Sequence, residues 1–296
     1  MRTLWPDPRV GSRASSSAVR PAEKRVAIRP APCWTEPMET DHAAVLARYD
    51  HQLRRSAPPD PGTRVERDGP VVRQTGGPDD WNGVLWSDLD EATADAAIAA
   101  QVRHFTARGH GFEWKAYAHD RPADLGARLR AAGFTPEPAE SLMVARSDGP
   151  AAAGEPPPGV RLAEVTGPEG VELVVRVHTA VFGTSAARLR HRLLTRLARD
   201  PGTLVLTVAL ADGEPVSAAR LELPAGTDFA GLWGGGTLPE WRGRGLYRAL
   251  VARRARLAAA RGFRYVQVDA TDQSSPILDR LGFAMLTTTR PYAYRP

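Results

Sequence analysis

Residues 237–247 read TLPEWRGRGLY, and this stretch decides which kind of fold surrounds it. The apolar run that ends at residue 238 predicts a strand, and residues 243–261 have the Leu and Ala spacing of a helix. The connecting loop has glycine at positions 243 and 245, where the missing Cβ lets a ligand approach the backbone closely. Backbone N–H groups and the helix dipole attract anions to the start of such a helix. The stretch therefore predicts a diphosphate site at the start of helix 243–261.

Two common nucleotide-binding patterns are absent from this stretch. It contains neither the GxxxxGK of nucleoside-triphosphate loops nor the GxGxxG of dinucleotide-binding folds. The residues therefore support neither of those two chemistries.

The segments on either side of the loop alternate between strand and helix patterns. Residues 203–210 and 216–223 flank the turn Asp212-Gly213-Glu214 and predict a hairpin. Strands and helices mixed in this way, with one hairpin in the middle, indicate an α/β or α+β fold. The other expected elements are strands 160–165, 229–238, 265–270 and 283–294, and helices 168–182, 187–199, 243–261 and 275–281.

The first half of the chain repeats landmarks of the second half in the same order, which predicts a duplicated unit. In the first half, however, Ser87-Asp88-Leu89-Asp90 replaces the glycine loop. Two aspartates at a helix N-terminus cap that helix and repel a diphosphate, so we do not expect the first half to bind one. The paired landmarks are Asp68-Gly69 with Asp212-Gly213, Leu85-Trp86 with Leu232-Trp233, Arg108-Gly109 with Arg261-Gly262, and Gly133-Phe134 with Gly282-Phe283.

Low-complexity segments predict how the chain divides. The N-terminal segment mixes Pro, Ser and Arg without apolar periodicity, which is typical of a disordered tail. A second run, rich in Pro and Ala, is typical of a linker between domains. Met38 stands directly before the first expected helix, so translation from Met38 instead of Met1 is an alternative. The expected parts are a basic tail at 1–37, a folded unit at 38–145, a linker at 146–158 and a second folded unit at 159–296.

Composition is that of a protein that buries a core without crossing a membrane. Apolar residues make up 42% of the 296 residues, and no apolar run approaches the ~18 residues of a membrane helix. The single cysteine, Cys33, excludes an internal disulfide and a multi-cysteine metal site. Residues 1–37 hold most of the net charge of +5, and a nearly neutral remainder argues against nucleic-acid binding. We expect a cytoplasmic protein with no metal and with no nucleic-acid or membrane partner.

The run Pro239-x-x-Arg242-Gly243-x-Gly245-Leu246 resembles the acetyl-CoA signature Q/R-x-x-G-x-G/A of the GNAT superfamily of N-acetyltransferases. The turn Leu281-Gly282-Phe283 resembles a second landmark of that family, and the expected element order agrees over residues 160–294. The resemblance implies two tandem GNAT-like domains, each a mixed, mostly antiparallel sheet flanked by helices, with a degenerate N-terminal copy. It also implies acetyl-CoA as the co-substrate, its pyrophosphate on the loop and its pantetheine at the end of the preceding strand. The implied cofactor-binding residues are Thr237, Leu238, Arg242, Gly243, Arg244, Gly245, Leu246 and Tyr247.

Three departures separate this chain from the family pattern. Tyr247 stands where the family prefers Gly or Ala, and Leu278 replaces the tyrosine with which many members protonate the departing thiolate. Strand 229–238 contains no carboxylate, although many members place their general base there. Asp269 and Ser275 remain as candidate catalytic residues, and their alternative roles are those of a turn residue and a helix cap.

These observations predict an N-acetyltransferase that moves an acetyl group from acetyl-CoA to an amine of a small molecule or protein. Two alternatives stay open. A catalytically inactive, CoA-binding regulatory protein agrees with the missing tyrosine and the carboxylate-free strand. A structural partner protein without a cofactor follows if Tyr247 blocks the loop.

Overall fold

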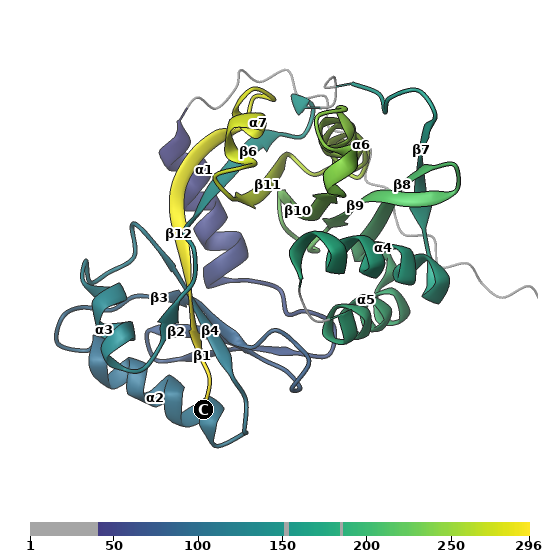
Figure 1. Ribbon diagram of the computed structural model, residues 1–296. Coiled ribbons are helices and arrows are strands. Elements are labelled where there is room, and N and C mark those ends of the chain that lie inside the picture. Colours follow the sequence, from purple (N-terminus) through teal and green to yellow (C-terminus); the bar gives the residue numbers. More distant parts are fainter. Residues whose placement is uncertain (1–40, 151–153, 184–185) are drawn as a thin grey trace, which may run out of the picture.

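The computed structural model describes residues 41–150, 154–183 and 186–296 (Figure 1). The tail expected at 1–37 and the alternative start at Met38 lie outside these residues. One mixed sheet runs through both halves of the chain, in the order β1-β2-β3-β4-β12-β6-β11-β10-β9-β8-β7, with the short β5 beside β12. Its strands are β1 (Arg64–Asp68), β2 (Val71–Thr75), β3 (Gly83–Ser87), β4 (Phe112–Tyr117), β5 (Thr135–Pro136), β6 (Glu140–Arg146), β7 (Val160–Val165), β8 (Leu204–Ala211), β9 (Glu214–Glu222), β10 (Phe229–Thr237), β11 (Tyr265–Ala270) and β12 (Ala284–Tyr294).

Helices cover both faces of this sheet. On β9, Leu221 packs with α6 in one buried cluster and Ala218 packs with α4 in another. Because side chains an odd number of residues apart point to opposite faces of a strand, α6 and α4 lie on opposite sides of the sheet. The helices are α1 (His42–Tyr49), continued by the π-helical turn η1 (Asp50–Arg55), α2 (Ala94–Thr106), α3 (Leu125–Ala131), α4 (Gly167–Phe182), α5 (Ala186–Arg199), α6 (Leu246–Ala260) and α7 (Ser275–Asp279).

The two halves exchange strands within the sheet. β6 comes from the first half, yet it lies between β11 and β12 and pairs antiparallel with both. The distal part of β12 lies between β4 and β5 of the first half, where the buried Tyr292 joins the core. Figure 1 shows β12 as one long curved strand that runs from the side of α7 to the side of α2. Each half therefore completes the sheet of the other, and the expected units 38–145 and 159–296 stay a prediction as separate folding domains.

Each half contains one parallel strand pair joined by a helix, β3-α2-β4 in the first and β10-α6-β11 in the second. The other strand pairs are antiparallel. This arrangement confirms the expected fold class of a mixed, mostly antiparallel sheet flanked by helices. The same strand-helix-strand unit at corresponding places in both halves supports the expected duplication.

Local signals set several element boundaries. Asp41 caps α1, because its carboxylate accepts hydrogen bonds from the backbone N–H groups of Ala43 and Ala44. The helix expected from residue 243 begins at Leu246 instead, because Gly245 has a left-handed backbone with φ of 85°. The other elements expected in the second half appear within one or two residues of their positions.

Candidate functional site

The loop between β10 and α6 presents an open helix start. Gly243 and Gly245 have φ values of 75° and 85°, which side chains other than glycine rarely adopt. Within the part of the chain that the structure describes, no side chain caps α6, so its first backbone N–H groups have no capping partner there. Arg242 braces the loop by donating from Nε to the carbonyl oxygen of Thr237, at 3.2 Å. The loop thus keeps a set of unpaired N–H donors at the positive end of a helix.

A cavity of about 800 Å³ begins at this loop. It continues between α4, the second half of β10, the end of β11 and α7. The β10–β11 pairing stops after Gly231 and Gln267, so the two strands separate there. On its other side β10 bulges between Trp233 and Gly236, which frees the backbone of two further glycines.

Most of the residues expected to bind the cofactor line this cavity. Leu238 and Arg244 do not: the Leu238 N–H donates to the carbonyl of Val216, and Arg244 stacks on Trp241 at 4.6 Å. The lining members are Thr237, Arg242, Gly243, Gly245, Leu246 and Tyr247.

Tyr247 lies inside the cavity beside the bulge and does not close the loop. A Cβ placed on Gly235 would lie 3.1 Å from its ring, and the phenol shares a hydrogen bond with Ser274. Burial raises the pKa of Tyr247 above its usual value. Leu278, in contrast, is fully buried in the core and does not reach the cavity.

The two candidate catalytic residues have different surroundings. Asp269 lines the cavity at the end of β11, and its carboxylate forms an ion pair with Lys115 of β4. Ser275 is at the start of α7, where its hydroxyl donates to the carbonyl of Thr271 at 3.1 Å. The ion pair engages one oxygen of Asp269, and Ser275 is outside the cavity lining. Both remain predictions as catalytic residues.

Glu140 is a residue that the sequence patterns did not single out. It begins β6 and lines the cavity on the side of Asp269. Its carboxylate makes no hydrogen bond or ion pair with the described residues, and Glu140 is half-buried. Burial and then the negative charge of Asp269 raise the pKa of Glu140 to about 7. No sequence signal pointed to it, because β6 belongs to the first half and reaches this site only through the strand exchange.

Buried cations give the bulge a positive environment. Arg254 of α6 is fully buried and donates to the backbone carbonyls of Arg220 and Trp233, the cross-strand pair next to the bulge. Burial lowers the pKa of Arg254 to about 10, still well above neutral pH. His178 of α4 lines the same cavity, and burial followed by the nearby Arg220 lowers its pKa to about 4. At neutral pH the bulge therefore lies next to charged arginines and a neutral histidine.

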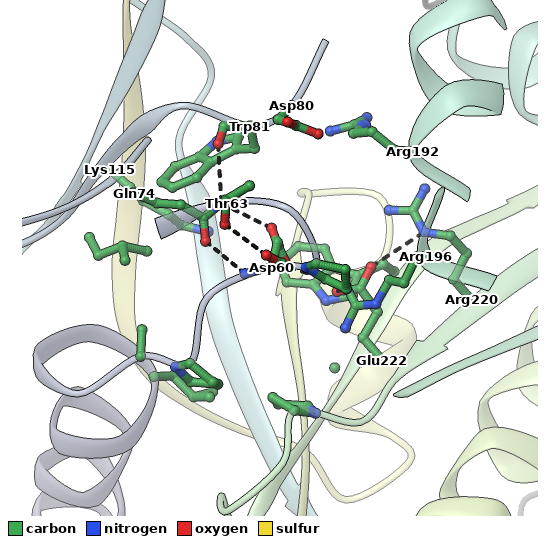
Figure 2. A pocket seen from close by; sticks show the side chains of 18 of the residues that line it. Asp60, Thr63, Gln74, Asp80, Trp81, Lys115, Arg192, Arg196, Arg220 and Glu222 are labelled. Carbon is green, nitrogen blue, oxygen red and sulfur yellow. Dashed lines mark hydrogen bonds and ion pairs between the residues drawn. The ribbon is translucent and has the colours of Figure 1, made fainter. Parts of the chain in front are cut away.

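A second cavity, of about 350 Å³, lies between α5, the segment after η1 and strands of both halves. It shares Arg220 and Trp233 with the first cavity, so the two meet beside the bulge. Figure 2 shows Arg196, Arg220 and Glu222 on one side of this second cavity, with Lys115 and Trp81 on the other. The site therefore has two compartments, which join where β10 and β11 separate.

The described parts of the chain contain neither a metal site nor a membrane-spanning helix. No group of three or more His, Cys, Asp or Glu side chains there is arranged to hold a metal ion. No helix among residues 41–150, 154–183 and 186–296 combines the length and the apolar character that a membrane span requires.

Part of the chain is similar to a known protein family. Residues 171–283 match the model of the acetyltransferase (GNAT) family. No curated protein matches the chain.

Solved structures of GNAT proteins share the fold. A GCN5-related N-acetyltransferase from Kribbella flavida is 19% identical, with a TM-score of 0.63 over 86% of this chain and 94% of that one. A tandem GNAT protein from the clavulanic acid biosynthesis pathway is 16% identical, with a TM-score of 0.55 over 80% and 84%. A GCN5-related N-acetyltransferase from Sphaerobacter thermophilus is 15% identical, with a TM-score of 0.54 over 77% and 78%.

Proposed function

Because residues 171–283 match the model of the acetyltransferase (GNAT) family, we propose that this protein transfers an acetyl group from acetyl-CoA to an amine. The observation that carries the proposal is the 800 Å³ cavity that begins at the glycine loop and ends where β10 and β11 separate. A cavity of this size and shape suits a long, flexible co-substrate with a diphosphate at one end and a reactive thioester at the other.

The residues present fit such a co-substrate. The diphosphate would lie on the N–H groups at the start of α6, next to Gly243 and Gly245. Arg242, Arg248 and Arg280 also line the cavity and supply positive charge for its phosphates. The thioester would lie beside the β10 bulge, where free backbone N–H groups polarise its carbonyl and Arg254 adds positive potential.

The acceptor amine would reach the thioester from the second cavity. That cavity opens on the face of the sheet that carries α5, opposite α6, and it joins the first cavity at Arg220 and Trp233. Both substrates can therefore be bound at once, on the two sides of the point where the strands separate. Direct transfer in a ternary complex follows from this arrangement.

Glu140 is the carboxylate that we assign as the general base. An alkyl amine is mostly protonated at neutral pH, so a base must take its proton before it attacks. Glu140 has a pKa of about 7 and no partner among the described residues, whereas Asp269 is held by Lys115. A base with a pKa near the working pH is the most effective.

Groups that line the cavity can take up and return the protons that the proposed reaction moves. The amine nitrogen bonds to the thioester carbon, the carbon–sulfur bond breaks, the amine proton passes to Glu140, and the sulfur takes up a proton. Tyr247 is the one tyrosine among the described residues that line this cavity, so we assign it the return of that proton. The products are an amide and free CoA.

The test is acceptor-dependent release of CoA thiol. The full chain is incubated with acetyl-CoA and a panel of amines, thiol is measured continuously, and the acetylated product is identified by mass spectrometry. We expect thiol release that rises with one class of amine. Tight binding of acetyl-CoA without turnover of any amine would favour the inactive regulatory protein. Absence of acetyl-CoA binding would favour the structural partner protein.

A further inference from the structure

Arg220 on β9 is a buried cation whose charge is poorly matched by its surroundings. Its side chain is 16% exposed, and its Nε has no hydrogen-bond partner among the described residues. The one ion-pair contact found for it there is Glu222 Oε1, at 3.7 Å from Nε, which is beyond hydrogen-bond distance. The other oxygen of Glu222 accepts from Arg196 at 3.1 Å. Arg196 also pairs with Asp60 at 3.3 Å, so among the described residues Glu222 is the one carboxylate within 4.0 Å of Arg220, and it is shared with Arg196.

The pKa values of Arg220 and His178 reflect an excess of positive charge around Arg220. Burial lowers the pKa of Arg220, and Arg192 and Arg196 lower it further, while Glu222 acts in the opposite direction. Arg192 lines the second cavity from α5 and makes no ion pair within 4.0 Å among the described residues. The low pKa of His178 has Arg220 and Arg192 among its causes. The Arg220 guanidinium therefore lies among other positive charges, and no carboxylate of the described residues accepts two hydrogen bonds from it.

The guanidinium of Arg220 also reaches the place where the substrates would meet. It lines both cavities, and a Cβ placed on Gly234 of the bulge would lie 3.4 Å from its terminal nitrogen. An anionic group of the acceptor that is bound by Arg220 would lie beside the thioester. The attacking nitrogen must also lie beside the thioester, so the two groups of the acceptor would be only a few bonds apart. Away from the bulge, apolar side chains such as Leu53, Trp81 and Leu189 form part of the lining of the second cavity, beside charged ones that include Asp60, Asp80 and Glu113.

We propose that the acceptor is an α-amino acid whose carboxylate is bound by Arg220, with its side chain in the apolar part of the second cavity. This inference rests on the proposed function, because it names the acceptor of the same site. Arg220 would form paired hydrogen bonds to the carboxylate, and Arg192 would add charge at the mouth of the cavity. A peptide N-terminus is excluded as the preferred acceptor, since its adjacent carbonyl group carries no charge.

Three matched amines test the proposal: L-phenylalanine, L-phenylalaninamide and 2-phenylethylamine, which share ring and amine but differ at the carboxylate. With acetyl-CoA and the full chain, we expect kcat/KM for phenylalanine to exceed that for either uncharged amine by about 10- to 100-fold. The amide has the less basic amine, so chemistry without recognition would favour the amide. Equal rates for the three amines, or faster reaction of the amide, would overturn the inference and leave the proposed function intact.

Variants locate the effect at Arg220. Arg220→Gln is expected to raise KM for phenylalanine and to abolish the preference for phenylalanine over phenylalaninamide and 2-phenylethylamine. Arg192→Gln, at an exposed position on α5, should reduce the preference by a smaller factor without a folding risk. Glu222→Gln should act in the opposite direction and strengthen the preference, because it removes the competing carboxylate. The matched control is Arg176→Gln, an exposed arginine of α4 that pairs with Glu214.

Two further measurements separate the remaining outcomes. Calorimetric titration of phenylalanine without acetyl-CoA detects the anion site independently of catalysis. Binding that Arg220→Gln removes, with no thiol release from any amine, would reject both the proposed function and the acceptor role.

A comparison of acetyl-CoA with succinyl-CoA examines the acyl group instead. An Arg220-dependent preference for succinyl-CoA would overturn the inference, because the bound anion would then belong to the donor.

Discussion

The two strand-to-helix junctions of the duplicated fold, β3 to α2 and β10 to α6, differ in what fills the start of the helix. In the second half, Gly243 and Gly245 have left-handed backbones, and no side chain caps α6. In the first half, the carboxylate of Asp90 accepts hydrogen bonds from the backbone N–H groups of Ala92 and Thr93, at 3.1 and 2.8 Å. Leu89, 3% exposed, packs into the core beside it.

Negative charge is favourable at both helix starts because each lies at the positive end of a helix dipole. The two starts differ in which group can supply that charge. In the first half, the carboxylate of Asp90 engages N–H groups of the turn that leads into α2, and a second anion would be repelled there. The second half leaves its N–H groups free beside a cavity, so the anion must come from a ligand. This difference agrees with the expectation that only the second half binds a diphosphate.

The largest effect is expected when the two halves are separated. Residues 159–296 alone lack β6, which leaves the edges of β11 and β12 unpaired, and they also lack Glu140. Unpaired strand edges of this kind lead to aggregation. We expect this fragment to yield no soluble protein that binds acetyl-CoA, and co-expression with residues 38–150 to restore binding. A monomeric, acetyl-CoA-binding 159–296 would show that the halves are independent after all.

A charged side chain in the glycine loop is expected to have the next largest effect. Gly245→Glu adds a carboxylate at the helix start and imitates what Asp90 does in the first half, so acetyl-CoA affinity should fall about 100-fold or more. Gly213→Glu is the matched control, because Gly213 has the same φ of 85° and open space around it. Calorimetry of the two variants should show the loss in Gly245→Glu alone. The parent should bind one acetyl-CoA per chain, and a second equivalent would contradict the inert first half.

The glycine loop was predictable from sequence because its chemistry is local. Adjacent residues in 237–247 specify the turn, the free N–H groups and the helix start, and the elements around them follow hydrophobic periodicity. Glu140 was not predictable, because its position depends on a strand that crosses into the other half of the sheet. Arg220 was missed for a related reason, since a strand arginine becomes informative only when its partners are known. Local patterns thus predicted the glycine loop as the co-substrate site, whereas the residues proposed for the acceptor side became visible only in the tertiary structure.

Replacing Glu140 tests whether the first half contributes to catalysis. Glu140→Gln should lower kcat about 100-fold or more without changing acetyl-CoA affinity, since the group acts on the amine proton. In the parent, kcat/KM should fall as the pH drops below about 7, where Glu140 becomes protonated, and the variant should lose this dependence. A variant with the parent's pH profile would remove Glu140 from the mechanism.

Stability provides a second readout for Glu140. Its pKa is raised by folding, so its contribution to stability is full below its ordinary value of 4.5 and is lost as the pH rises through about 7. Glu140→Gln should therefore raise the melting temperature at about pH 8 and leave it nearly unchanged at about pH 4. If Glu140 serves the reaction at the expense of stability, its replacement should give a protein that is slower and more stable than the parent. Loss of stability together with loss of activity would instead indicate a structural role.

The smallest effect is expected at the matching position of the first half. Hydrogen bonds led by the Thr93 side chain lower the pKa of Asp90, so its carboxylate stabilises the fold above its ordinary pKa of 3.8 and loses that effect as the pH falls. Asp90→Ala should therefore lower the melting temperature slightly at neutral pH and much less in acid, with acetyl-CoA affinity and kcat unchanged. If the variant instead gained a second acetyl-CoA site, the carboxylate would be the only barrier to binding in the first half. An unchanged stoichiometry would show that Leu89 and the absent glycines also close that junction, so one substitution cannot reverse the divergence of the two copies.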